Sequence, residues 1–266
     1  MNKKINKVAI YKNNNEKSIE VEEKLIKELE KLGLEVVDEN YDLAISIGGD
    51  GTFLKMVNKT NFNEDVYYVG IKTGTLGFLQ ELTTEDYKVF FENIINNILT
   101  IEEIALEEIN VITKNSTYHY LALNEVVIRR KDLKVLESKI KIDDVFLEDY
   151  AGDGLLISTN VGSTAYNMSL DGSIIDKNIT ALALTPVAPL RSKMYKNLNN
   201  SIILSKERII ELEPTTSNLI LTIDGINKEI NDVIKIQVKI SEHKIKCLKR
   251  NSDNFIKTVH DKLIGN

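Results

Sequence analysis

The segment LAISIGGDGTFLKM, residues 43–56, decides the fold class of this chain. Its short apolar run LAISI is typical of a strand that is buried in a parallel sheet. The residues GTFLKMVNK, which follow the glycines, are predicted to form a helix. A strand, a tight turn and a helix in this order are the repeating unit of an α/β domain.

The same alternation continues on both sides of this segment. Two further strands are predicted at residues 7–11 and 66–71. Two further helices are predicted at residues 13–33 and 83–98. In the first helix, Leu25, Leu29 and Leu32 fall on one face among glutamates and lysines. The second helix is expected to be capped by Thr84 or Thr83, with acidic residues in its first turn.

After about residue 100 the spacing of apolar residues changes from a helical period to a period of two. In SKIKID (138–143) and VIKIQVKI (233–240), isoleucine and valine alternate with lysine and glutamine. Such strands bury one face and expose the other, as antiparallel sheets do. The C-terminal segment returns to helical spacing, with Phe255, Val259 and Leu263 at i, i+4 and i+8.

These patterns predict two domains and a returning helix. The first is an α/β domain with a parallel sheet over residues 1–100, and the second is a β-rich, sandwich-like domain over residues 101–250. The C-terminal helix, residues 251–266, is expected to pack on the first domain.

Composition limits the classes of function. The 266 residues carry a net charge of −6, which argues against a nucleic acid or an anionic membrane as the main partner. No apolar stretch approaches the length of a membrane span, so a cytoplasmic location is expected. The single cysteine, Cys247, is expected in the core, and the three histidines lack zinc-ligand spacing; His119 is expected to be structural or on the surface.

The glycine turn is an anion site by construction, because a helix start offers unpaired N–H groups and a positive dipole end. Asp50 lies at its centre, where a carboxylate repels phosphate. We therefore interpret Asp50 as a proton acceptor or as an anchor for a nucleotide-bound cation. The alternative is that Asp50 caps the helix. Lys55, one turn later, either meets a phosphate or is a solvated surface residue.

Two other stretches carry candidate binding groups. GDGLLISTNVGSTAYNMSLDG, residues 152–172, contains a strand ending near Ser158 and then many small hydroxylated residues around Tyr166. This composition suits a pocket for a ribose and a base edge, whereas its structural alternative is a polar turn between strands. In LALNEVVIRR, Asn124 offers an amide to an adenine-like edge, and Glu125 accepts from ribose hydroxyls.

Taken together, these motifs resemble the NAD kinase family. The resemblance rests on GGDGTFL, KTGTLGFL (72–79), LNE (123–125), GDGLLISTNVGSTAY and IDG (223–225), in this order over nearly the whole chain. Lipid kinases and phosphofructokinases share the glycine–aspartate–glycine turn, but the GDG…ST…GSTAY run is specific to NAD kinases.

The resemblance implies phosphoryl transfer from ATP or another donor to the 2′-hydroxyl of the adenosine ribose of NAD, with a divalent cation such as magnesium, in a homodimer or homotetramer. It implies that Asp50 is the general base. The residues implied to bind NAD are Asp50, Gly51, Lys55, Phe78, Asn124, Glu125, Asp153, Ser158, Thr164, Ala165, Tyr166, Ser169 and Ala188. The phosphate loop is Gly48, Gly49, Gly51 and Thr52, and no metal-ligating residue is assigned.

The chain departs from the family pattern at six positions: Lys72, Thr75, Ala151, Asn160, Val161 and Ile226. These departures bear on phosphate contacts and substrate preference more than on the base. Lys72 is expected to replace part of the positive charge that the pattern otherwise supplies.

Two other functions compete with this interpretation. A diacylglycerol-type lipid kinase shares the glycine turn but usually has a longer C-terminal domain, and a non-catalytic NAD(P) sensor retains the pocket. A classical dehydrogenase is disfavoured, because no G-x-G-x-x-G motif follows the first strand.

Overall fold

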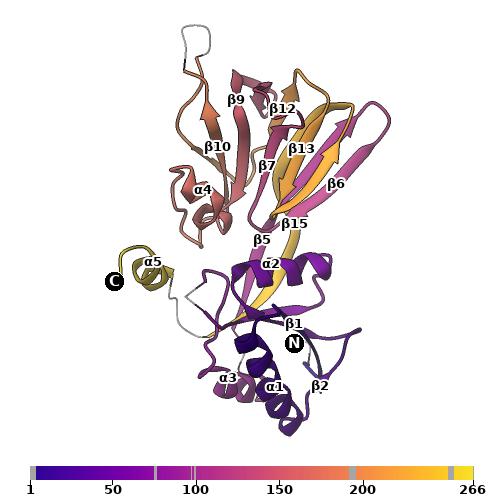
Figure 1. Ribbon diagram of the computed structural model, residues 1–266, viewed down its shortest axis with the longest axis vertical. Coiled ribbons are helices and arrows are strands. Elements are labelled where there is room, and N and C mark those ends of the chain that lie inside the picture. The colour runs from indigo at the N-terminus through magenta and orange to yellow at the C-terminus, as the bar shows by residue number, and fades with distance from the viewer. Residues whose placement is uncertain are drawn as a thin grey trace. The chain divides into compact units, whose positions relative to one another are not determined.

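The computed structural model describes residues 4–74, 77–96, 98, 100–191, 196–250 and 255–265. The chain divides into two compact units (Figure 1). Unit 1 comprises residues 1–104 and 244–266, and unit 2 comprises residues 105–243. No helix among the described residues is long and apolar enough to cross a membrane.

Unit 1 is an α/β structure built on a parallel sheet with the strand order β2-β1-β3-β4-β15. Its strands are β1 (Lys7–Lys12), β2 (Glu35–Val36), β3 (Leu43–Gly48), β4 (Tyr67–Lys72) and the end of β15 (Val233–Lys249). Every residue of β3 is buried, which confirms the sequence interpretation of LAISI. This strand occupies the middle of the sheet and delivers the glycine turn at its carboxyl end.

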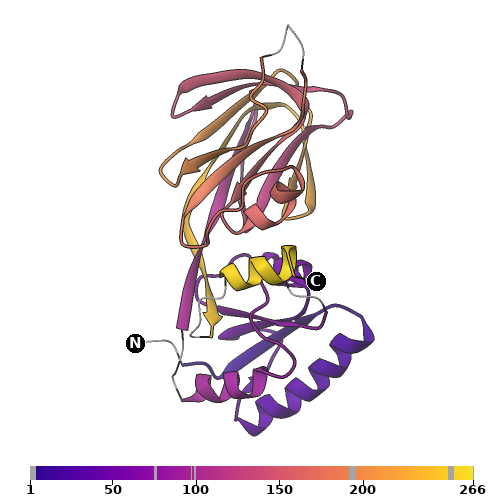
Figure 2. The same ribbon diagram turned by 90° about the vertical axis from the view of Figure 1, so that its left-hand side faces the viewer.

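Helices cover both faces of this sheet (Figure 2). Helices α1 (Glu16–Lys31) and α3 (Tyr87–Ile95) lie on one face, and α2 (Asp50–Lys59) and α5 (Phe255–Leu263) lie on the other. Leu25 and Leu29 of α1 are fully buried, as predicted.

The start of α3 differs from the prediction. The helix begins at Tyr87 after Asp86, which makes no side-chain cap, and neither Thr83 nor Thr84 caps it. Instead, the Thr83 hydroxyl donates to the Asp86 carboxylate at 2.7 Å and accepts from the Asp86 N–H at 3.3 Å. A local side-chain turn therefore replaces the first predicted helical turn.

Unit 2 is rich in antiparallel strands, with the order β14-β13-β7-β9-β8-β12-β15 along its main path. These strands are β7 (Glu125–Arg130), β8 (Leu136–Ile142), β9 (Val145–Thr159), β12 (Ile210–Pro214), β13 (Leu219–Ile223) and β14 (Ile226–Ile230). The remaining elements are β5 (Thr100–Thr113), β6 (Thr117–Ala122), η1 (Gly162–Thr164), α4 (Tyr166–Ser169), β10 (Ala181–Pro189) and β11 (Ile202–Ser205).

The long strand β15 contributes to both units. Its first part pairs antiparallel with β12, where Ile236 and Val238 are buried, and its last part pairs parallel with β4 at Lys246 and Cys247. Cys247 is buried in this sheet, as expected, and burial raises the pKa of its thiol to about 12. The thiol is therefore unreactive at neutral pH.

Candidate active site

The glycine turn joins β3 to α2 as the sequence predicts. Gly49 is the N-cap of α2 and Asp50 is its first residue, and no side chain caps the helix. The capping alternative for Asp50 is therefore wrong. Gly49 and Gly51 are exposed and Thr52 is half-buried, so the turn offers its backbone to solvent. Gly48 ends β3 and is buried.

The Asp50 carboxylate accepts hydrogen bonds from the backbone of a second turn, which carries Phe78 and Leu79. The Phe78 N–H donates to Oδ2 at 2.8 Å, and the Leu79 N–H donates to Oδ1 at 3.1 Å. Gly77 makes this approach possible, because a Cβ at this position would overlap the Asp50 carboxyl group. The carboxylate is thus oriented by two backbone donors that lie 28 and 29 residues away in sequence.

A buried amide fastens the two turns to each other. The Gln80 amide donates from Nε2 to the Gly49 carbonyl at 2.8 Å, and Ser46 of β3 donates from Oγ to Gln80 Oε1 at 3.3 Å. Gln80 and Ser46 are both buried. This arrangement holds the main chain of the glycine turn in place before any ligand binds.

One positive charge contacts Asp50 from the C-terminal helix. Lys262 Nζ lies 3.8 Å from Asp50 Oδ2 and 4.4 Å from the centroid of the Phe78 ring. Phe78 is half-buried, whereas Lys55 of α2 is exposed and makes no described contact. Lys72, at the end of β4, is half-buried.

In unit 2, Asp224 organises the turn that carries Asn124 and Glu125. Its carboxylate accepts from the N–H groups of Leu123 and Asn124, both at 2.8 Å, while the Asp224 N–H donates to the Glu125 carbonyl at 3.1 Å. Asp224, Asn124 and Glu125 are all buried. The predicted LNE and IDG stretches therefore meet, although they are about a hundred residues apart in sequence.

The run of small residues that follows β9 is hydrogen-bonded to the turn that carries Asn124. The Thr159 hydroxyl donates to the Leu123 carbonyl at 2.7 Å, and the Thr159 N–H donates to the Asn124 carbonyl at 2.9 Å. Gly162 lies against that carbonyl so closely that a Cβ would overlap it. The run is small because the main chain of the turn packs directly on it, which the polar-turn alternative does not require.

Buried acids surround Glu125. Burial and the neighbouring Asp224 charge raise the pKa of Glu125 to about 7, while the Tyr166 N–H donates to the Glu125 carboxylate. Glu107 of β5 is fully buried and neither of its carboxyl oxygens has a partner within the described chain. Burial, with the charges of Asp224 and Glu125, raises the pKa of Glu107 well above its usual value.

The other predicted residues of unit 2 differ in their burial and contacts. The Tyr166 hydroxyl accepts from Arg129 at 2.9 Å. Ser158 is fully buried opposite Glu125, and its hydroxyl has no described partner. Thr164 and Ala165 are half-buried, whereas Asp153, Ser169 and Ala188 are exposed.

The positions that depart from the family pattern differ in burial and in their contacts. Ala151 is buried in β9 and its main chain pairs with the Asn197 side chain. Asn160 is buried and donates to the Lys177 carbonyl at 2.9 Å. Val161 is half-buried, and Ile226 is exposed on β14. Thr75 lies outside the described residues.

The predicted residues are divided between the units, with Asp50 and Phe78 in unit 1 and Asn124, Glu125 and Tyr166 in unit 2. Sequence reasoning missed Gln80, Glu107 and Lys262 altogether, and it gave no role to Leu79, although Leu79 ends the recognised stretch KTGTLGFL. Asp224 lay within a recognised stretch, but no sequence signal gave it a role.

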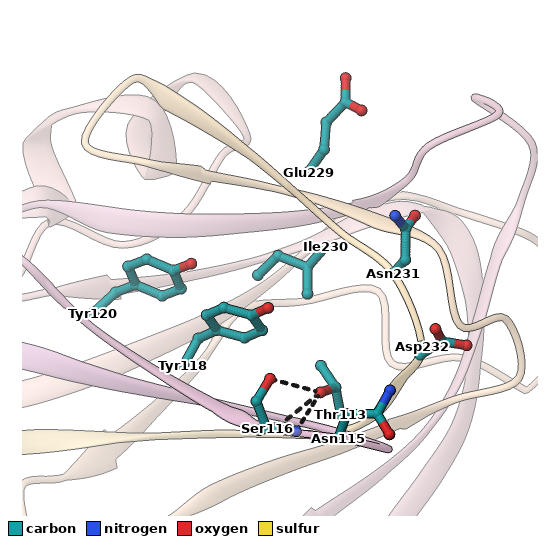
Figure 3. A pocket seen from close by; sticks show the side chains of 9 residues that line it. All are labelled: Thr113, Asn115, Ser116, Tyr118, Tyr120, Glu229, Ile230, Asn231 and Asp232. Carbon is teal, nitrogen blue, oxygen red and sulfur yellow. Dashed lines mark hydrogen bonds between the residues drawn. The ribbon is translucent and has the colours of Figure 1, made fainter.

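A separate polar cavity of about 270 Å³ lies in unit 2 (Figure 3). Thr113 and Ser116 are hydrogen-bonded at one end of it, and the rings of Tyr118 and Tyr120 stack along one side at 6.4 Å between centroids. None of the predicted site residues lines this cavity. His119 lies on the intervening position of β6 and is exposed, in keeping with a surface role.

The described residues contain no group of three or more His, Cys, Asp or Glu side chains that could hold a metal ion. Asp50 is a single carboxylate beside an anion-attracting helix start. This donor set fits Mg²⁺, which proteins commonly bind with one or two carboxylates and the phosphates of a substrate. It does not fit a metal ion held by the protein alone.

Comparisons with known proteins give one consistent result. The ATP-NAD kinase N-terminal domain model matches residues 1–98, and the ATP-NAD kinase C-terminal domain model matches residues 123–250. A protein of Finegoldia magna named NAD kinase is 35% identical over 274 residues, covering 99% of this chain and 100% of its own length. The NAD kinase of Streptococcus gordonii is 34% identical, covering 97% and 96%.

Solved structures show the same fold. Yeast NADH kinase complexed with NADH superposes with a TM-score of 0.86 at 23% identity, over 99% of this chain and 88% of its own. An NAD kinase from Archaeoglobus fulgidus in complex with ATP gives a TM-score of 0.77 at 22% identity, over 96% and 98%.

Proposed function

This chain belongs to the NAD kinase family, and we infer that it transfers the terminal phosphoryl group of ATP to the 2′-hydroxyl of the adenosine ribose of NAD, forming NADP. The observation that carries the inference is the fixed carboxylate of Asp50 at an open helix start. A helix start attracts phosphate, and a carboxylate accepts the proton of a hydroxyl.

Asp50 accepts the 2′-hydroxyl proton as the ribose oxygen attacks phosphorus. The two backbone donors occupy one lone-pair direction on each oxygen, and a carboxylate has about four such directions in all. The N–H groups of Phe78 and Leu79 orient the base, while the main chain of the glycine turn faces the phosphates. A magnesium ion entering with ATP would neutralise phosphate charge beside Asp50.

The unit 2 residues supply the recognition of NAD. Asn124 offers amide donors and an acceptor, Glu125 offers an acceptor for ribose hydroxyls, and Tyr166 offers an aromatic face. Asp224 and Thr159 hold the main chain of the turn that carries Asn124 by hydrogen bonds. The cytoplasmic location, the homodimeric or homotetrameric assembly and magnesium as the cation are proposed from the family resemblance. The lipid-kinase and sensor alternatives are not proposed, because full-length relatives are named NAD kinases.

The test is to incubate the purified chain with ATP, magnesium and NAD and to measure NADP. We expect Asp50→Asn to lose about 10²- to 10⁴-fold in kcat, the usual contribution of a general base, with NAD affinity retained. Asp38→Asn is the control, since Asp38 is exposed and makes no described contact.

Asn offers only one acceptor oxygen to the two N–H groups, so the thermal midpoint of Asp50→Asn is measured as well. Turnover near the parent rate would refute the base assignment. A parent protein that makes no NADP would refute the function itself.

A further inference from the structure

Helix α5 belongs to unit 1 but packs loosely on the rest of it. None of its residues is buried, and its apolar side chains Ile256 and Leu263 are 72% and 41% exposed. Four of its residues are half-buried, namely Phe255, Thr258, Val259 and Lys262, and only 22% of the Lys262 side chain is exposed. A cation therefore shares the less exposed side of α5 with the apolar residues Phe255 and Val259.

The contacts of Lys262 leave its hydrogen-bonding capacity unused. Its ammonium group lies over the Phe78 ring and 3.8 Å from Asp50 Oδ2, which is too far for a hydrogen bond. Within the described chain the ammonium makes no hydrogen bond, although it has three N–H donors. The pair is therefore an ion contact at 3.8 Å without a hydrogen bond, and the N–H donors of Lys262 stay available to a ligand.

The reaction requires positive charge at this place. The ribose oxygen must come within about 3–3.5 Å of phosphorus while Asp50 takes its proton. The phosphoryl oxygens then lie close to the Asp50 carboxylate, and the two groups carry charge of the same sign. Lys55, the lysine expected from the sequence to meet a phosphate, is exposed and has no described contact with Asp50.

We propose that Lys262 of the C-terminal helix is a catalytic residue that donates to the transferring phosphoryl group of ATP beside Asp50. The proposal rests on the proposed function and goes beyond it by placing helix α5 in the active site. In the step, the ribose oxygen forms a bond to the γ-phosphorus as the bond between that phosphorus and the β,γ-bridging oxygen breaks. The proton passes to Asp50, ADP leaves, and Lys262 stays protonated throughout.

Three variants test this proposal: Lys262→Ala, Lys262→Arg and Lys257→Ala. Lys257 is the matched control, because it lies on the same helix, is exposed and makes no described contact. We expect Lys262→Ala to lose about 10- to 100-fold in kcat/KM for ATP, the effect of one charge-assisted hydrogen bond, with unchanged Kd for NAD. Arginine is expected to restore part of the loss, and Lys257→Ala to match the parent.

Added methylamine distinguishes a catalytic role of Lys262 from a role in holding α5 in place. If Lys262 supplies a cation to phosphate, methylammonium raises the turnover of Lys262→Ala and leaves Lys257→Ala unchanged. The proposal is overturned if Lys262→Ala keeps the parent kcat/KM for ATP, or if its loss is accompanied by an equal loss of NAD affinity and no amine response. In either case NADP formation by the parent still supports the proposed function.

Discussion

The carboxylate of Asp50 is held by the backbone N–H groups of Phe78 and Leu79 and not by a cap on its own helix. The glycine–aspartate–glycine pattern could indicate the residue and its chemistry, because a helix start and a carboxylate are local features. Its partners could not be predicted, since backbone N–H groups of Phe78 and Leu79 carry no side-chain signature. Lys262 also lacked a signal, because nothing local distinguishes it from Lys257, the exposed lysine of the same helix.

Gly77→Ala tests whether the turn positions the base. The added methyl group overlaps the Asp50 carboxyl group, so the carboxylate must shift. We expect kcat to fall at least about 10-fold and the free energy of unfolding to fall by about 1–3 kcal/mol. Steady-state kinetics and urea denaturation measure the two effects.

The control for this substitution is Gly74→Ala. An added Cβ at Gly74 meets no atom within 4 Å, and Gly74 is exposed near the same turn. Equal behaviour of the two alanine variants would show that the position of Asp50 does not depend on Gly77.

At the scale of elements, the helices and strands that follow from periodicity are present, and the errors occur at their ends. The helix predicted from residue 83 begins at Tyr87, and a turn that Thr83 and Asp86 hold by reciprocal hydrogen bonds precedes it. The strand that leads into GSTAY was predicted at Leu155–Ser158, but it is the end of the longer β9. Tertiary hydrogen bonds decide such ends, and they join segments whose pairing no local pattern reveals.

Asp224→Asn tests the junction of β7, β9 and β13. An Asn side chain can accept from only one of the N–H groups of Leu123 and Asn124, leaving the other unpaired in a buried site. We expect a loss of about 1–3 kcal/mol in the free energy of unfolding and weaker NAD binding, with KM for ATP little changed. Calorimetric titration with NAD measures the affinity.

Asp232→Asn is the matched comparison. Asp232 has a similar left-handed backbone, with φ 57° against 46° for Asp224, but its side chain is exposed. A comparable loss of NAD affinity in both variants would contradict the positioning role of Asp224.

At the scale of the whole molecule, the parallel sheet of unit 1 includes a strand that arrives after unit 2. The sequence could indicate an α/β part and a strand-rich part because their periods differ. It could not indicate that β15 serves both, because the alternation of Ile234–Ile240 resumes out of step at Ile245 and Cys247, with no local sign of the sheet that this second part joins. The ion pairs of Lys249 with Glu81 and Glu102, each at 3.3 Å, fasten the end of β15 within unit 1.

The buried acids of unit 2 predict how stability depends on pH. The pKa values of Glu107 and Glu125 are raised in the folded protein, so the folded state holds protons that the unfolded chain releases above about pH 4.5. Their contribution to stability is fully present below that pH. The contribution of Glu125 is lost as pH rises through about 7, and that of Glu107 is lost as pH rises toward its own raised pKa. Glu107→Gln mimics the protonated acid. We expect its free energy of unfolding at pH 8 to exceed that of the parent by about 1–3 kcal/mol.

Urea denaturation at several pH values between 5 and 8 measures this effect. The advantage of Glu107→Gln must grow with pH, while Glu108→Gln, at the partly exposed neighbouring position on β5, must show no such growth. A constant difference between Glu107→Gln and the parent would exclude proton uptake by Glu107.

The late arrival of the last strand and helix has a consequence for biosynthesis. On the ribosome, the first hundred residues emerge without their fifth strand and without Lys262, whereas residues 105–243 emerge as an uninterrupted block. Synthesis therefore makes all of residues 105–243 before residues 244–263 bring the last strand and Lys262 to the α/β part, so the strand-rich part is complete in sequence before the α/β part is.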